Sequence, residues 1–209
     1  MLHQMGYNGG GLGKHENGIH QPITVQVNSG RKGIGTKNPK RTTNNVKPWP
    51  PNTTLVIGDS MLGGLEKMGF SNYSTKVKSH GGSTVDDTYD YIAPLLKKKP
   101  ANVILHVSTN DAPGKSARMI FEELSNLKIH IENELPNVRV IISCPIFRSD
   151  DAKANRTLRE LDSKLKGSSF DIVSHDNIDG TCLSKRGLHL NRKGSKILAE
   201  NYIAQIQRF

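Results

Sequence analysis

The chain has 209 residues, of which 34% are hydrophobic and 23% charged, and its formal net charge is +10. This composition is typical of a soluble protein and argues against collagen-like, membrane-embedded and disulfide-scaffold classes. The strongly apolar runs, such as 138–146, fall far short of the roughly 20 residues that cross a bilayer, and residues 1–13 lack the apolar centre of a signal peptide. We therefore expect an intracellular protein, nuclear or cytoplasmic, that makes no membrane contact.

The positive charge is concentrated at the start of the chain. Residues 1–52 hold seven Lys or Arg residues against the single acid Glu16, a net charge of +6, whereas residues 53–209 carry only +4. A basic segment favours a phosphate-rich or acidic partner, although a solvated basic tail has the same composition.

Glycine is also concentrated at the start. Nine of the 20 glycines lie within residues 1–35 without the three-residue period of collagen, so this segment cannot build a core alone. Residues 37–52 are polar and rich in proline and lysine, and we predict a linker there. Trp49, inside that linker, can either stack on a base or pack against the domain that follows.

The order of residues in 1–36 resembles the G-patch family. The match runs from Met-Gly-Tyr at 5–7 through Gly-Leu-Gly-Lys at 11–14 to Gly-Ile-Gly at 33–35. The resemblance implies a partner-binding arm that engages RNA, single-stranded nucleic acid or a DEAH-box RNA helicase; the alternative is a disordered glycine-rich tail. The binding residues that it implies are Met5, Gly6, Tyr7, Gly11, Leu12, Gly13, Lys14, Gly18, Gly33, Ile34 and Gly35.

From residue 53 onward, short apolar runs alternate with amphipathic stretches, which is typical of an α/β domain with a parallel sheet. The apolar and β-branched runs predict five strands, at 54–57, 74–78, 102–107, 138–143 and 171–173. The amphipathic stretches predict five helices, at 61–68, 84–98, 116–134, 152–166 and 192–206.

Gly58-Asp59-Ser60 follows the first predicted strand directly and precedes a predicted helix. This position places Ser60 at the carboxyl edge of the sheet, where ligands of α/β proteins bind. A serine there is either a nucleophile or a helix N-cap.

Three further motifs follow in order: Gly-Gly-Ser-Thr at 81–84, Ser-Thr-Asn-Asp at 108–111 and Gly-Leu-His-Leu-Asn at 187–191. With Gly58-Asp59-Ser60 they resemble the SGNH hydrolases, or GDSL-type esterases, over residues 53–209. The resemblance implies a three-layer α/β/α sandwich with a five-stranded parallel sheet.

The same resemblance implies the roles of four residues: Ser60 as nucleophile, His189 as general base, and the Ser60 and Gly82 amides with the Asn110 side chain as the oxyanion hole. A serine hydroxyl needs a base to take its proton, and the oxyanion formed from an ester needs preorganised donors. Purely structural roles remain open for three of them. Gly82 can form a tight turn, Asn110 can be a turn residue followed by Asp111 as a helix cap, and His189 can be a packed histidine.

Two positions depart from the family pattern. Arg186 stands where the family has an aspartate three residues before the histidine, and a cation there would weaken the base. Asp176 and Asp179 are near enough in sequence to be substitutes. Ser108 replaces the glycine that normally opens the third motif.

We predict no metal and no cofactor, because the histidines are scattered without a metal-binding spacing and the two cysteines do not form a CxxC motif.

Two functions stay open: hydrolysis of small acetyl or acyl esters, or a catalytically impaired hydrolase scaffold whose role is binding. Residues 188–194 are also similar to esterase domains of animal LINE-type retrotransposon proteins.

Overall fold

The computed structural model describes residues 46–209 of the chain. The arm residues that the G-patch resemblance singles out lie outside this range, so their predicted contacts are not described. The strands are β1 (Thr54–Gly58), β2 (Thr75–Ser79), β3 (Asn102–His106), β4 (Arg139–Ser143) and β5 (Ile172–Val173). The α-helices are α1 (Val85–Leu96), α2 (Ala117–Glu134), α3 (Ala152–Lys166) and α4 (Arg192–Ile206).

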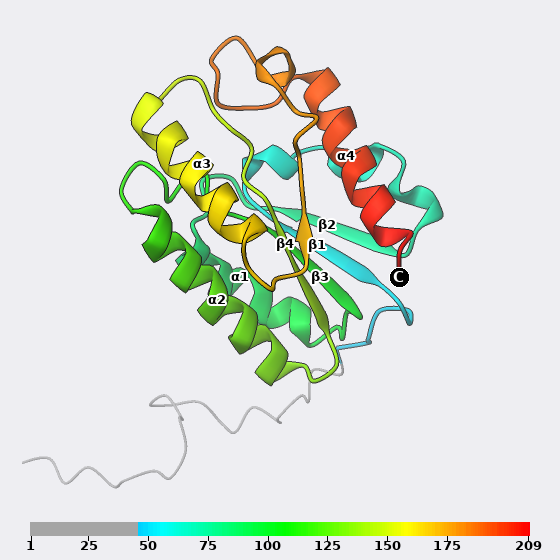
Figure 1. The fold of residues 1–209 in the computed structure, drawn as a ribbon. Coiled ribbons are helices and arrows are strands. Elements are labelled where there is room, and N and C mark those ends of the chain that lie inside the picture. The colour runs from blue at the N-terminus through cyan, green and yellow to red at the C-terminus, as the bar shows by residue number, and fades with distance from the viewer. Residues whose placement is uncertain (1–45) are drawn as a thin grey trace, which may run out of the picture. The chain divides into compact units, whose positions relative to one another are not determined.

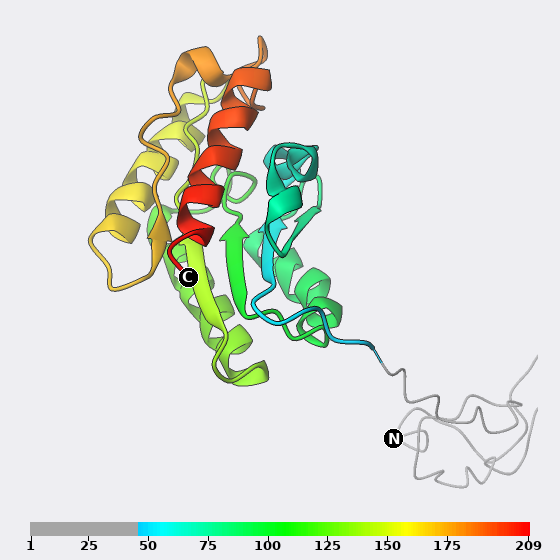
Figure 2. The same cartoon turned by 90° about the vertical axis from the view of Figure 1, so that its right-hand side faces the viewer.

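The five strands form one parallel sheet in the order β2-β1-β3-β4-β5 (Figures 1 and 2). Helices α1, α2 and α3 pack on one face, and α4 with four short 3-10 helices covers the other. The predicted three-layer α/β/α sandwich is therefore confirmed.

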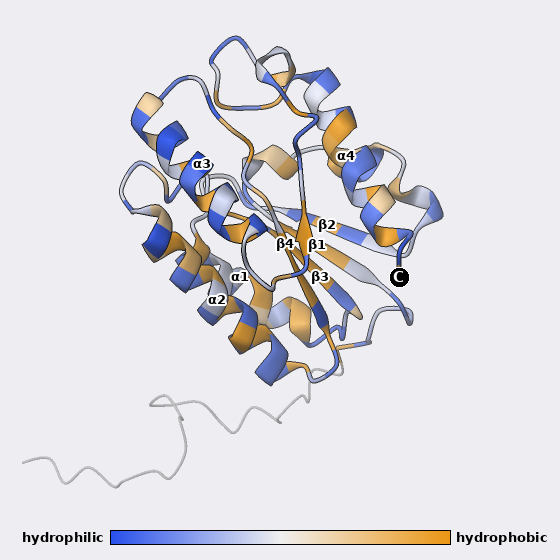
Figure 3. Ribbon diagram, in the orientation of Figure 1, coloured by the Kyte–Doolittle hydropathy of each residue, from blue (hydrophilic) through white to orange (hydrophobic). Residues whose placement is uncertain are grey.

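The central strands β1, β3 and β4 supply both layers of the core because successive side chains point to opposite faces of a sheet. In β1, Leu55 and Ile57 pack toward α1–α3, whereas Val56 packs toward α4. Both faces are covered, so the central strands β1 and β3 are buried throughout, and their middle residues are apolar, which Figure 3 draws in orange.

The helix boundaries follow from side chains that cap their first turns. Thr84 begins α1 with a reciprocal capping box to Asp87, and Ser116, Asp151 and Asn191 accept backbone N–H groups at the starts of α2, α3 and α4. Each cap satisfies amide groups that a helix leaves unpaired, which explains why these four predicted helices agree closely with the structure.

The helix predicted at 61–68 is wrong. This region instead forms the 3-10 helices η2 (Ser60–Leu62), η3 (Leu65–Lys67) and η4 (Phe70–Asn72). Gly64 and Gly69 adopt φ values of 78° and 91°, a left-handed conformation that ends a right-handed helix. Leu62, Leu65 and Phe70 are buried in the α4-side core, so the apolar pattern is kept although the helix is interrupted.

The chain reaches β1 along the surface of the domain. The Trp49 amide donates to the Lys98 carbonyl oxygen at 2.8 Å, and the indole packs against the core on the α1–α3 side. Packing on the domain is thus the role of Trp49 that the structure supports.

No helix within residues 46–209 has the length and apolar character to cross a membrane.

Candidate active site

Ser60 lies immediately beyond the end of β1, and close backbone packing fixes its position. A Cβ on Gly58 would come within 1.9 Å of the His106 carbonyl oxygen, so only glycine allows β1 and β3 to approach here. The Asp59 amide donates to that same oxygen at 3.1 Å, and the Asp59 carboxylate accepts the Met61 amide at 2.9 Å. Asp59, and not Ser60, is therefore the N-cap of η2, which leaves the half-buried Ser60 hydroxyl free to react.

His189 approaches Ser60 from the loop that precedes α4. Its Nε2 lies 3.1 Å from Ser60 Oγ, which is within the hydrogen-bond distance that a general base needs to activate a nucleophile. The loop is folded on itself: the Ser184 amide donates to the His189 carbonyl oxygen, and Leu183 forms an antiparallel bridge with Leu190. His189 is exposed, so it is not a packed core histidine.

The glycine motif lies beside Ser60 at the end of the neighbouring strand β2. The His80 amide donates to the Gly58 carbonyl oxygen at 2.8 Å, and Ser79 Oγ donates to the Asp59 carbonyl oxygen at 2.9 Å. Gly82 then takes a φ of 78° in open space. This conformation suits a tight turn, and the exposed Gly82 amide remains available to a ligand.

Asn110 lies beyond the end of β3 and contacts the glycine motif through its side chain. Its Nδ2 donates to the Ser83 carbonyl oxygen at 2.9 Å, which uses one of the two N–H groups of the amide. The half-buried position of Asn110 leaves the second N–H for an oxyanion. The structure thus brings Asn110 to the residue that follows Gly82.

Asp111 has a structural role next to that amide. Its buried carboxylate accepts the Val85 amide at the start of α1 and pairs with Lys115 at 2.8 Å. Burial raises the pKa of Asp111, although Lys115 and the Val85 amide oppose the rise. Asp111 therefore caps α1, a helix that precedes it in the chain, and not the helix that follows.

Two residues shape the backbone around Asn110. Ser108, which replaces the family glycine, has a φ of 134°, a conformation that favours glycine. The mostly buried Arg148 donates from Nη1 to the Thr109 carbonyl oxygen at 3.4 Å, while its Nε and Nη2 hold Asp150 at 2.7 and 2.6 Å. Nothing in the sequence pattern indicates Arg148, because its contact with Thr109 spans 39 residues.

No carboxylate supports His189 within residues 46–209. Arg186, at the family's aspartate position, is exposed. Asp176 accepts hydrogen bonds from Lys166 and Ser174, and Asp179 caps η5 (Gly180–Cys182) through Thr181. These bonds lower the pKa of both aspartates and engage them away from His189, so neither is the predicted substitute. The candidate site is a serine–histidine dyad.

A buried polar network lies behind the dyad, and the sequence analysis missed it. Ser143 Oγ lies 2.7 Å from His106 Nδ1, 2.7 Å from His175 Nε2 and 2.9 Å from the Tyr202 hydroxyl. Burial lowers the pKa of His106 and lowers that of His175 to about 3, so both rings are neutral at physiological pH. Asp59 Oδ2 and His106 Nε2 have no hydrogen-bond partner in the part of the chain that the structure describes.

The described residues hold no group of three or more His, Cys, Asp or Glu side chains that would bind a metal ion. The chemistry available at the site is therefore that of a half-buried serine, an exposed histidine and nearby N–H donors. This arrangement at the carboxyl edge of a parallel sheet is typical of serine hydrolases.

The fold is that of the GDSL-type lipases and acylhydrolases. A GDSL-like lipase from Bacteroides thetaiotaomicron superposes with a TM-score of 0.63 at 14% identity, covering 75% of this chain and 88% of that one. The lipase/acylhydrolase from Enterococcus faecalis gives 0.60 at 17% identity, with 75% and 95% covered. The psychrotrophic esterase EstA from Pseudoalteromonas gives 0.58 at 15% identity, with 75% and 97% covered.

Residues 1–37 match the G-patch domain, one residue beyond the stretch predicted from sequence. The chain therefore joins a G-patch domain to a domain with the SGNH hydrolase fold. No curated protein matches the sequence.

Proposed function

We propose that this protein is an intracellular serine ester hydrolase that acts on small acetyl or acyl esters and is held near RNA or ribonucleoprotein by its G-patch domain. The observation that carries the proposal is the 3.1 Å separation between Ser60 Oγ and His189 Nε2 at the carboxyl edge of the sheet. The fold shared with lipases and acylhydrolases supports the same reaction class, although fold alone does not determine function.

In the proposed reaction, His189 Nε2 takes the Ser60 proton while Oγ attacks the ester carbonyl carbon. The oxyanion is stabilised by the Ser60 and Gly82 amides and the free N–H of Asn110, and removal of one such donor typically costs about 100- to 1000-fold in rate. Collapse expels the alcohol, which takes the proton from His189, and water then hydrolyses the acyl-serine by the reverse roles. Because no carboxylate of the described part of the chain stabilises the imidazolium, we expect slow turnover.

The test is covalent labelling of the full chain with a fluorophosphonate, read by intact mass. We expect one adduct on the wild type and none on Ser60→Ala. Ser71→Ala, an exposed serine in η4, serves as the matched control and should label like the wild type. An adduct that persists on Ser60→Ala, or a folded wild type that does not label, would overturn the assignment of Ser60.

A second function is favoured by one observation, the missing carboxylate partner of His189. In that case the hydrolase-like domain is an impaired scaffold, and the protein acts by binding nucleic acid or a DEAH-box RNA helicase through residues 1–36. The similarity of residues 188–194 to LINE-type esterase domains, which remains a prediction, is compatible with either function.

Binding is tested by titrating the full chain with single-stranded RNA and DNA at several salt concentrations. The basic segment 1–52 leads us to expect an affinity that falls steeply with salt, since each neutralised phosphate releases counterions. A protein that labels at Ser60 but binds no nucleic acid at low salt would retain the hydrolase function and lose the nucleic-acid version of the binding function.

A further inference from the structure

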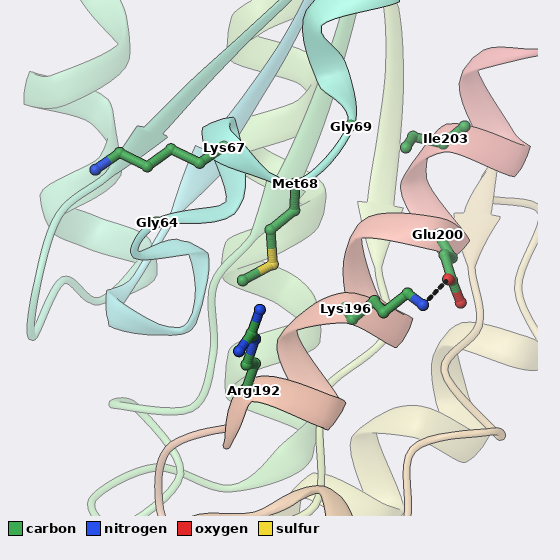
Figure 4. A pocket seen from close by; sticks show the side chains of 8 residues that line it. All are labelled: Gly64, Lys67, Met68, Gly69, Arg192, Lys196, Glu200 and Ile203. Carbon is green, nitrogen blue, oxygen red and sulfur yellow. Dashed lines mark ion pairs between the residues drawn. The ribbon is translucent and has the colours of Figure 1, made fainter.

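A separate cavity lies between the 3-10 segment that follows Ser60 and helix α4. Its volume is about 600 Å³, within the range of small-molecule sites. The cavity is bordered by Gly64, Lys67, Met68 and Gly69 on one side and by Arg192, Lys196, Glu200 and Ile203 of α4 on the other (Figure 4). It begins four residues after Ser60 and three after His189, but neither dyad residue lines it.

One cation faces this cavity without a counter-charge. Figure 4 shows the Arg192 guanidinium pointing from the start of α4 toward Met68. Within residues 46–209 no carboxylate lies within ion-pair distance of Arg192, whereas Lys196 forms a long, exposed contact of 3.8 Å with Glu200. A cation in the first turn of a helix opposes the macrodipole, so helix stability does not explain Arg192.

Two of the lining side chains, Met68 and Ile203, are apolar. Met68 and Ile203 are half-buried and present a thioether and an aliphatic side chain to the same space as the guanidinium. From Val46 onward, no aromatic side chain lines the cavity, so the described walls lack the stacking surface that single-stranded nucleic acid uses. Lys67 lines the rim by its aliphatic stem, and its ammonium points away.

We propose that this cavity binds an amphiphilic oxyanion, a carboxylate or phosphate head with an aliphatic tail. The planar guanidinium of Arg192 pairs with the head in a bidentate manner, and the tail lies against Met68 and Ile203. The Lys196 ammonium is directed at Glu200 and is not assigned to the head group. The site is independent of ester hydrolysis, because the ligand needs no bond that Ser60 can break.

The test is calorimetric titration of the full chain with octyl phosphate and nonanoate, which carry the same eight-carbon alkyl chain and differ in the head group. We expect saturable 1:1 binding of at least one, and a Kd about fourfold lower for each added methylene that becomes buried. Inorganic phosphate, acetate and octanol should bind far more weakly. Equal affinity for octyl phosphate and inorganic phosphate would overturn the role of the apolar wall.

Three variants locate the ligand. Arg192→Gln should raise the Kd about tenfold or more, and Met68→Gln should abolish the dependence on tail length while leaving the head contact. Lys67→Gln, the matched control, removes the same charge from the rim and should bind like the wild type. The proposal would be overturned if Lys67→Gln weakened binding as much as Arg192→Gln. It would also be overturned if an RNA oligonucleotide, whose own binding depends on Arg192, displaced the ligand.

Discussion

His189 has no anionic partner among residues 46–209. We expect this residue-scale feature to limit turnover. In serine hydrolases the carboxylate orients the imidazole and stabilises its charged form, and loss of its function lowers kcat by about 10⁴ in serine proteases. Arg186→Asp should therefore raise kcat/KM on p-nitrophenyl acetate by at least about tenfold. Lys185→Asp makes the same charge change at the adjacent exposed position. An equal gain in both variants would indicate a general electrostatic effect and not a restored triad.

Ser108 adopts a backbone conformation that is unfavourable for a residue with a Cβ. Its φ of 134° is sparsely populated by residues with a Cβ, and such strain costs on the order of 1–3 kcal/mol. Glycine relieves the strain but enlarges the entropy of the unfolded chain, so Ser108→Gly should raise the free energy of unfolding by about 1 kcal/mol net.

Urea unfolding measures this change. Thr109→Gly is the control, because Thr109 has no positive φ to relieve and should lose stability. A less stable Ser108→Gly protein would show that the Ser108 side chain contributes more by its contacts than its backbone costs.

At the scale of elements, the loop that carries His189 depends on one glycine. Gly187 has a φ of 72°, and a Cβ there would lie 2.3 Å from Ser149 Oγ and 3.0 Å from the Asp150 amide nitrogen. Gly187→Ala should lower the free energy of unfolding by about 2–4 kcal/mol through backbone strain and overpacking. The shift of the loop should also move His189 from Ser60 and reduce fluorophosphonate labelling.

Gly64→Ala separates the two causes. Gly64 has a similar φ of 78°, but nothing lies within 4 Å of its Cβ position. We expect this control to lose only the strain component, about 1–2 kcal/mol, and to label normally. If Gly187→Ala loses no more stability than Gly64→Ala, the contact with Ser149 does not hold the loop.

The elements also show why sequence predicts some structure well and some poorly. Helices α1 to α4 follow from local signals, because the capping side chain lies within three residues of the amide it satisfies. The error at 61–68 has a local cause as well: the apolar spacing is helical, but Gly64 and Gly69 adopt left-handed conformations that a periodicity does not register.

At the scale of the whole molecule, one part of the candidate site can be predicted from sequence and another part cannot. Ser60, Gly82, Asn110 and His189 belong to short motifs at strand ends or before a helix, so their order predicts one edge of a parallel sheet. The buried network does not follow from sequence, because the contact between Ser143 and Tyr202 joins residues 59 positions apart. Only the packing of β3, β4, β5 and α4 brings its members together.

That network makes the stability of the hydrolase-like domain depend on pH. Burial lowers the pKa of His106 and of His175 in the folded state, so below pH 6.5 the unfolded chain binds protons that the folded chain does not. Stability is therefore full above pH 6.5 and falls as pH decreases, by up to about 1.4 kcal/mol per pH unit for each histidine. For His175 this fall continues toward its folded pKa of about 3, and His106 acts in the same direction. Urea unfolding between pH 7.5 and 5.5 measures the slope. His175→Gln keeps a polar side chain next to Ser143 but removes one titrating group, so its slope below pH 6.5 should be shallower by about one histidine. An unchanged slope would mean that His175 is protonated equally in both states, which its burial and its 2.7 Å contact with Ser143 Oγ oppose.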